Sequence, residues 1–114
     1  MSKTLVLVTG ANKGIGYEAV KALLQSERPY HVFLGSRSAE RGQQAVETLR
    51  NECSGTGQNT VEHIELDIAS DASIENAFQT VKTSAGRLDV LINNAGAHSP
   101  SAHISRVSLI SRPH

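Results

Sequence analysis

Apolar residues along this chain follow two alternating spacings. Four short runs have the length and the β-branched content of strands buried on both faces: residues 4–9, 31–35, 61–66 and 88–92. Between these runs, apolar residues recur every three or four positions, which is the spacing of one face of a helix. The pattern therefore predicts four strands that alternate with three helices.

Local signals place the ends of these helices. The first begins near Ile15 and cannot continue through Pro29. Ser38 and Ser70 are suitable N-caps for the second and third helices, and Gly86 suits the end of the third. The stripes that would pack against a sheet are Ile15, Ala19, Ala22 and Leu23 in the first helix, Ala45, Val46 and Leu49 in the second, and Ile74, Ala77, Phe78 and Val81 in the third.

The alternation of strands and helices also predicts the fold class. Short connections imply parallel strands joined by right-handed crossovers. We expect an α/β, Rossmann-like parallel sheet with strand order 3-2-1-4, the incomplete first half of a doubly wound fold. In such a sheet the ligand lies beyond the carboxyl ends of the strands, which here are followed by residues 10–16, 35–37, 67–68 and 93–96.

Composition narrows the class of protein. The 114 residues include 11 basic and 11 acidic side chains, a balance that argues against a surface built for nucleic acid or an anionic membrane. The apolar run at residues 5–8 is too short for a signal peptide or a membrane span. Cys53 is the one cysteine, so no internal disulfide can form. We therefore expect a cytoplasmic domain.

The distribution of charge suggests a boundary at Gly96. Residues 1–96 hold all 11 acidic residues, whereas residues 97–114 hold two arginines, five serines, three histidines and no acid. We expect residues 1–96 to form the folded unit and residues 97–114 to be a polar tail, disordered or unrelated to the fold. The fourth strand would then expose its edge, and apolar side chains of residues 6–8 and 90–92 would be uncovered on the face served by the third helix alone.

The turn after the first strand, TGANKGIG at residues 9–16, is the strongest chemical signal. Its glycines, Gly10, Gly14 and Gly16, permit a sharp turn and a close approach of the backbone to a ligand. The following helix directs its N-terminal amides and positive dipole end at the same point. Glycines also form tight turns without a ligand, but this cluster's place between a buried strand and an amphipathic helix favours a phosphate site.

Three motifs in register resemble the short-chain dehydrogenase/reductase family. They are TGANKGIG, the Asp67-Ile68 pair after the third strand, and NNAG at residues 93–96 after the fourth. The resemblance covers about residues 3–96, and the first motif is most similar to that of NADPH-dependent carbonyl reductases. It implies a dinucleotide cofactor and hydride transfer that reduces carbonyls or oxidises alcohols.

The resemblance also implies roles for particular residues. Asp67 would accept a hydrogen bond from the adenine amino group, and Ile15 would lie beneath the nicotinamide side. The other residues placed around the cofactor are Gly10, Asn12, Gly14, Gly16, Ile68, Asn93, Ala95 and Gly96. Without the resemblance, Asp67 is also readable as a helix-start carboxylate near Ser70, and Asn93 as part of a strand-ending turn.

Charge after the second strand bears on the choice of cofactor. NAD-binding domains usually place a carboxylate there to bind the ribose hydroxyls, whereas this chain has Ser36 and Arg37 and no acid before Glu40. An additional phosphate would be held by Arg37 and Lys13, and one charge-assisted contact contributes about 1.5–3 kcal/mol. We therefore expect NADP(H) to be preferred over NAD(H). The alternative is that Arg37 is only a solvated residue before a helix.

Residues for the reaction itself are missing. The resemblance implies a serine and a Tyr-x-x-x-Lys pair downstream of residue 96, where the chain has no tyrosine and no lysine. Tyr17 and Lys21 have that spacing, but any helix face produces it, and they follow the first strand. We predict no catalytic residue in the chain. His98 and His103 lack a placed carboxylate or thiol, so we predict no metal site.

Three interpretations remain open. The chain is the cofactor half of an NADP-dependent carbonyl reductase, shortened by truncation, altered splicing or a gene-model error. Alternatively, it is a dinucleotide-binding module without catalysis, or one half of a split enzyme that another chain completes. The change of composition after Gly96 favours the first. The small carbonyl or alcohol substrate and the oligomeric state leave no signal in these residues.

Overall fold

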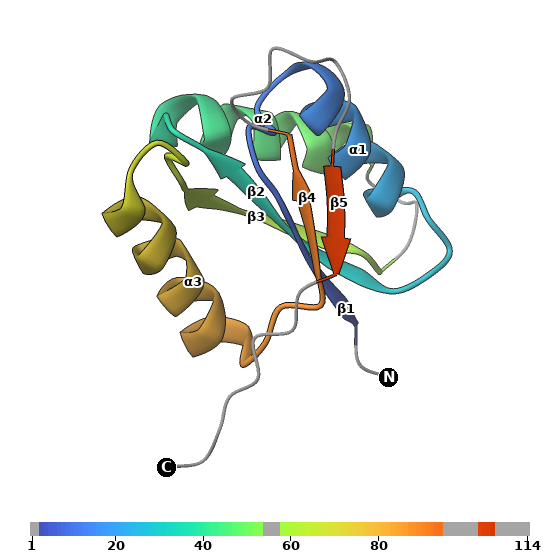
Figure 1. Ribbon diagram of the computed structural model, residues 1–114. Coiled ribbons are helices and arrows are strands. Elements are labelled where there is room, and N and C mark those ends of the chain that lie inside the picture. Colours follow the sequence, from blue (N-terminus) through green and yellow to red (C-terminus); the bar gives the residue numbers. More distant parts are fainter. Residues whose placement is uncertain (1–2, 54–57, 95–102, 107–114) are drawn as a thin grey trace.

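The computed structural model describes residues 3–53, 58–94 and the backbone of residues 103–106. Its elements are β1 (Thr4–Val8), α1 (Gly14–Leu24), β2 (Tyr30–Ser36), α2 (Ala39–Glu52), β3 (Thr60–Glu65), α3 (Asp71–Ala85), β4 (Val90–Asn93) and β5 (His103–Arg106). The strands form one sheet in the order β3-β2-β1-β4-β5 (Figure 1). The predicted α/β class and the order 3-2-1-4 of the parallel strands are confirmed.

Helices lie on both faces of the sheet. α1 and α2 cover one face, and α3 covers the other (Figure 1). The first face buries Val6, Val8 and Ile92 against α1 and α2, and the second buries Leu7 and Leu88 against α3. No helix in the described part of the chain has the length and hydropathy required to cross a membrane.

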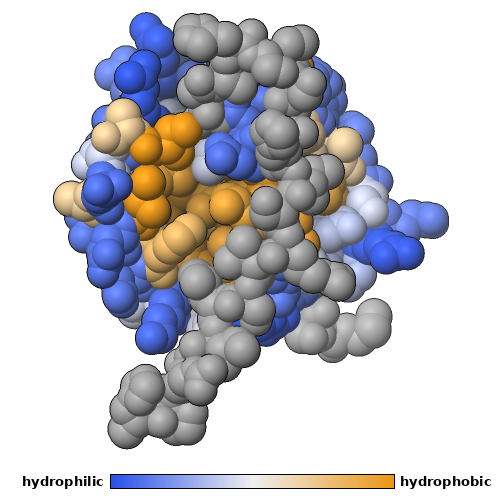
Figure 2. All heavy atoms as spheres, in the orientation of Figure 1, coloured by the Kyte–Doolittle hydropathy of each residue, from blue (hydrophilic) through white to orange (hydrophobic). Residues whose placement is uncertain are grey.

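The prediction for the face beneath α3 needs a correction. Val6, Val8 and Ile92 point to the opposite face, because alternate residues of a strand face opposite sides. Leu7 and Leu91 do face α3, where Leu7 is fully buried and Leu91 is half-buried. Figure 2 shows apolar side chains gathered on this face beside α3. Only alternate residues of β1 and β4 face α3, so the uncovered apolar surface is smaller than predicted from the sequence.

β4 also has a neighbour that the sequence did not predict. His103–Arg106 pair with it in antiparallel orientation, and Ile104 lies opposite Ile92. The expected exposed edge of β4 is therefore occupied by a strand from the segment predicted to be a polar tail. Unpaired backbone groups at the edge of a sheet can pair with almost any extended segment, so composition alone is a poor guide to such pairing.

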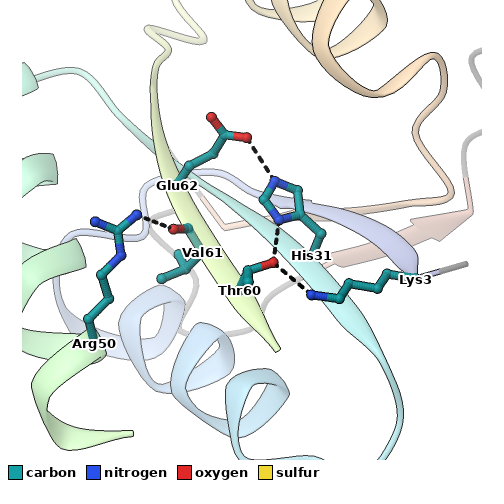
Figure 3. A network of polar contacts seen from close by, with 6 residues as sticks. All are labelled: Lys3, His31, Arg50, Thr60, Val61 and Glu62. Atoms are coloured by element: carbon teal, nitrogen blue, oxygen red, sulfur yellow. Dashed lines mark hydrogen bonds and ion pairs between the residues drawn. The ribbon is translucent and has the colours of Figure 1, made fainter. Parts of the chain in front are cut away.

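Side chains secure the opposite edge of the sheet, at β3 (Figure 3). The imidazole of His31 lies between Thr60 and Glu62, with Nδ1 2.6 Å from Thr60 Oγ1 and Nε2 2.7 Å from Glu62 Oε1. Arg50 Nη2 donates to the carbonyl oxygen of Val61 at 2.8 Å. Charged and hydrogen-bonded side chains of this kind hinder the pairing of a further strand with an edge.

Candidate functional site

An open cavity of about 900 Å³ lies beyond the carboxyl ends of the parallel strands. The lining residues follow β1, β2, β3 and β4, and they are Gly10, Asn12, Lys13, Gly14, Ile15, Ser36, Arg37, Ser38, Arg41, Leu66, Asp67, Ile68, Ala69 and Asn94. Of the residues predicted to bind a cofactor, Gly16 and Asn93 are not in this lining. Ala95 and Gly96 fall outside the described residues.

The glycines after β1 have different functions. Gly10 and Gly14 have φ angles of 58° and 66°, in the left-handed region that favours glycine. Apart from its own helix and chain neighbours, no atom of the described residues lies within 4 Å of the place where a Cβ on Gly14 would stand. A Cβ on Gly16, by contrast, would stand 2.7 Å from the oxygen of Gly10 and 2.8 Å from Asn94 Nδ2. Gly16 therefore allows α1 to pack closely on the turn.

The N-terminus of α1 differs from those of the other two helices. Ser38 Oγ accepts a hydrogen bond from the Arg41 amide, and Ser70 Oγ accepts one from the Ser73 amide, each at 3.2 Å. No side chain in the described residues caps α1, which begins after Lys13. Its first amides and the positive end of its dipole therefore suit an anion.

Ile15 adds an apolar group at the same place. It is 46% exposed and is the one large hydrophobic side chain so exposed among the described residues. Ile15 lies in the first turn of α1 and lines the cavity. A ligand bound in the cavity would cover this side chain, and its predicted place beneath the nicotinamide stays a prediction.

Positive charge dominates the lining. Lys13, Arg37 and Arg41 are all exposed there, and Asp67 is the one acidic residue in the described lining. Three cations and one carboxylate give the cavity a field that attracts anions. Arg41 was not among the residues predicted from the sequence, because Arg37 precedes α2 and Arg41 reaches the lining only through the direction of that helix.

Two serines form the turn between β2 and α2. The buried Ser36 donates from Oγ to the Ser38 carbonyl at 2.8 Å and accepts from the Ser38 amide at 3.1 Å. These bonds fix the backbone on both sides of Arg37. The amide of Ala11 donates to the Gly35 carbonyl at 2.8 Å. This bond connects the segment to the glycine turn, residues 9–16 after β1.

Asp67 combines the two interpretations that the sequence left open. Its Oδ1 accepts from the Ala69 amide at 3.0 Å, and its own amide donates to Ser73 Oγ at 2.8 Å, so it shapes the turn before α3. Asp67 also lines the cavity, as does Ile68 beside it. The local structural role is therefore compatible with contact to a ligand.

The two asparagines at the end of β4 have separate tasks. Asn93 Oδ1 accepts from the Thr9 hydroxyl at 3.0 Å, which ties β4 to β1. Asn94, which the sequence analysis did not select, lines the cavity and donates from Nδ2 to the Gly10 carbonyl at 3.2 Å. Neighbouring residues at a strand end face opposite sides, so the sequence motif alone could not separate them.

The structure gives Tyr17 a partner outside the cavity. Its hydroxyl donates to Glu52 Oε1 at 2.8 Å, and Lys21 Nζ lies 3.7 Å from the same oxygen. Burial, together with the hydrogen bond to Glu52, raises the pKa of Tyr17 to about 12. A general acid or base needs a pKa near the working pH, so this shift has the wrong direction for catalysis. Within the described residues, no group of three or more His, Cys, Asp and Glu side chains could hold a metal ion.

Comparison with known proteins gives a consistent result. The family model for short chain dehydrogenases matches residues 4–110, and so extends beyond Gly96. Short-chain dehydrogenase/reductase tropE from Talaromyces stipitatus is 48% identical over 94 residues, which cover 82% of this chain and 35% of that protein. (+)-Neomenthol dehydrogenase from Arabidopsis thaliana is 46% identical over 90 residues, covering 79% and 29%.

Solved structures show the same relationship. Menthone neomenthol reductase from Mentha piperita matches with a TM-score of 0.75 and 42% identity, over 85% of this chain and 33% of that chain. L-sorbose reductase from Gluconobacter frateurii, solved with NADPH and L-sorbose, matches with a TM-score of 0.73 and 26% identity, over 86% and 35%. The chain spans about a third of the length of these relatives. The chain belongs to the short-chain dehydrogenase/reductase family.

Proposed function

We propose that this chain provides the cofactor-binding part of an NADP(H)-dependent oxidoreductase that reduces carbonyls or oxidises alcohols. One observation carries the proposal: the start of α1, which no side chain in the described part of the chain caps, opens onto the same cavity as Lys13, Arg37 and Arg41. A dinucleotide with a third phosphate needs such a combination of free amides and cations. When bound, the cofactor supplies the hydride.

Each part of the cofactor has residues that fit it. The pyrophosphate would lie over Gly14, where a Cβ would have open space around it. The adenine would lie beside Asp67 and Ile68, and the additional ribose phosphate beside Arg37, with Arg41 in the first turn of α2. That relatives are solved with NADPH supports this assignment.

We further propose that the 114-residue chain binds the cofactor without turning over a substrate. The cofactor-binding unit is residues 1–96, and the chain has no tyrosine after Tyr30 to supply the expected proton donor. Substrate and reaction direction would be decided by elements of the longer relatives that have no counterpart here.

A second candidate function has one observation in its favour. β5 occupies the outer edge of β4 in antiparallel orientation, where a further parallel strand would otherwise pair. This pairing favours a dinucleotide-binding module without catalysis over one half of a split enzyme. Sequencing the 3′ end of the transcript separates the candidates: a shifted or intron-retaining frame after codon 96 indicates a shortened enzyme, and a clean stop indicates a module or a split enzyme.

Calorimetric titration of the chain with NADPH and with NADH tests the cofactor assignment. We expect NADPH to bind about ten- to 150-fold more tightly, the equivalent of one charge-assisted contact. Arg37→Asp should erase or reverse the preference, and Lys13→Ala should weaken NADPH more than NADH. Arg28→Asp makes the same charge change at an exposed position after α1 and should leave the preference intact. Equal affinities of the unaltered chain for both cofactors would refute the proposal.

A further inference from the structure

We infer that His63 and Gly42 form a spacer that positions the first turn of α2 and thereby strengthens the preference for NADP(H) over NAD(H). The spacer is the contact between the imidazole of His63, on β3, and the backbone of Gly42, in α2. This inference rests on the proposed function, and it assigns a positioning role to two residues that do not line the cavity.

The contact leaves no room for a Cβ at position 42 while the ring of His63 keeps its place. A Cβ on Gly42 would overlap Cδ2 and Nε2 of His63 and would stand 2.9 Å from Cγ. Gly42 is buried, and its amide donates to the Ser38 carbonyl at 2.9 Å as part of a regular helix. The helix therefore needs no glycine here for its own geometry. The imidazole of His63 requires the glycine, because the ring occupies the space that a side chain at position 42 would fill.

The ring is held in an uncharged form at a local cost. His63 Nε2 is the one buried side-chain nitrogen or oxygen without a hydrogen-bond partner among the described residues. An unpaired buried polar atom destabilises the folded chain, so its retention calls for an explanation. Burial lowers the pKa of His63, and a hydrogen bond to the Ser36 backbone and the charge of Glu65 oppose this only in part. The neutral ring thus contacts both Ser36 and Gly42.

These two contacts lie at the two ends of one wall of the cavity. Ser36, Arg37, Ser38 and Arg41 line that wall, and Gly42 follows it directly. The glycine turn that would bind the pyrophosphate belongs to another segment. Asn94 ties it to β4, and the Ala11 amide ties it to β2. A shift of α2 would therefore move the cations at the ribose phosphate and leave the pyrophosphate site in place.

The test compares both cofactors on variants of the full chain. Gly42→Ala should lower the affinity for NADPH about tenfold, because one charge-assisted contact is weakened, and change the affinity for NADH by less than about twofold. Gly42→Ala combined with His63→Ala removes the overlap and should restore most of the NADPH affinity. Gln43→Ala is the matched control, because it alters a neighbouring exposed position without adding a Cβ.

The ratio of the two affinities separates positioning from a general structural role. An unchanged ratio in Gly42→Ala would mean that the ring moves aside, and it would overturn the inference. An equal loss for both cofactors that the double variant does not restore would also overturn it. If Gly42→Ala fails to fold, recovery of the fold and of the ratio in the double variant supports the spacer, and an unaltered ratio in His63→Ala alone contradicts it. Equal affinities in the unaltered chain would refute the proposed function instead.

Discussion

The two ends of the parallel strands are built differently. At the amino ends, polar groups are matched within the protein: Asp89 Oδ2 accepts from the Leu5 amide at 2.9 Å, and Arg87 Nε donates to Asp89 Oδ1 at 3.0 Å. At the carboxyl ends, the first amides of α1 face an open cavity with no side chain of the described residues to cap them. Hydrogen-bonding groups are completed where only stability is needed and left open where a ligand is expected.

Asn59 is an example of the matched polar groups at the amino ends of the strands. Its Nδ2 donates to the carbonyls of Leu23 and Ser26 at 2.9 and 3.0 Å, and its Oδ1 accepts from the Tyr30 amide at 2.9 Å. One side chain thereby completes the end of α1 and joins it to β2. At the start of the same helix, no side chain within residues 3–53 and 58–94 has an equivalent capping role. α1 therefore has one structural end and one end available for binding.

The largest expected effect on cofactor affinity comes from a side chain that blocks the start of α1. Gly14→Val should weaken NADPH and NADH alike by at least about 100-fold, because a branched side chain would occupy the place of the pyrophosphate. Gly86→Val is the matched control: Gly86 also has a positive φ, 82°, and open space around its Cβ position, but it ends α3. Both variants bear similar backbone strain, so calorimetry should find weakened binding only in Gly14→Val. An unchanged dissociation constant in folded Gly14→Val would contradict the phosphate site.

A change at the other end of α1 should lower stability and leave cofactor affinity unchanged. Asn59→Ala removes the hydrogen bonds of this side chain to backbone groups of Leu23, Ser26 and Tyr30 and should lower the free energy of unfolding by about 1–3 kcal/mol. Its NADPH affinity, measured where the variant is folded, should equal that of the unaltered chain. Urea unfolding and calorimetry measure the two quantities separately. Loss of cofactor binding in the folded variant would show that the two ends are not independent.

A smaller effect should appear in the pH dependence of stability. Burial lowers the pKa of His63 below its usual 6.5. As pH falls through 6.5 the unfolded state binds its proton first, so the free energy of unfolding should decrease on acidification towards the pKa of the folded state. His63→Ala should remove this part of the slope. Urea titrations at a series of pH values test this, and an identical slope in both proteins would contradict it.

The smallest effect is expected at Tyr17. Tyr17→Phe removes one hydrogen bond, to Glu52, and should cost no more than about 1 kcal/mol of stability because Tyr17 is only partly buried and Glu52 is exposed. With NADPH and a panel of aldehydes, ketones and quinones, absorbance of the reduced cofactor should show no sustained turnover in either protein. Turnover that disappears in Tyr17→Phe with NADPH affinity intact would identify Tyr17 as the proton donor.

Local patterns were sufficient to predict most of the fold. Ser38 and Ser70 cap the helices they were expected to cap, because a capping oxygen acts within three residues. β5 could not be predicted, because its pairing with β4 depends on a distant edge and not on its own composition. The predicted tail therefore contributes a strand.

The sequence predicted those residues of the candidate site whose position after a strand places them at the carboxyl end of the sheet. Arg37 directly follows β2, and Gly14 lies where the connection after β1 enters α1, so the sequence was enough to place both residues at the carboxyl end of the sheet. Arg41 reaches the cavity only through the direction of α2, and the contact between His63 and Gly42 joins residues from two elements. Such positions require the packing of the helices and not the sequence of one segment.

We expect the carboxyl end of the sheet to bind a phosphorylated nucleotide and the amino end not to bind one. Amide chemical shifts of the full chain, recorded by NMR during titration with 2′,5′-ADP, test this claim. We predict the largest changes at Gly14 and Ile15 and around Arg37 and Arg41, with no comparable change at Asn59 or Asp89. Saturable changes confined to the amino end, or none at any of these amides, would contradict the claim.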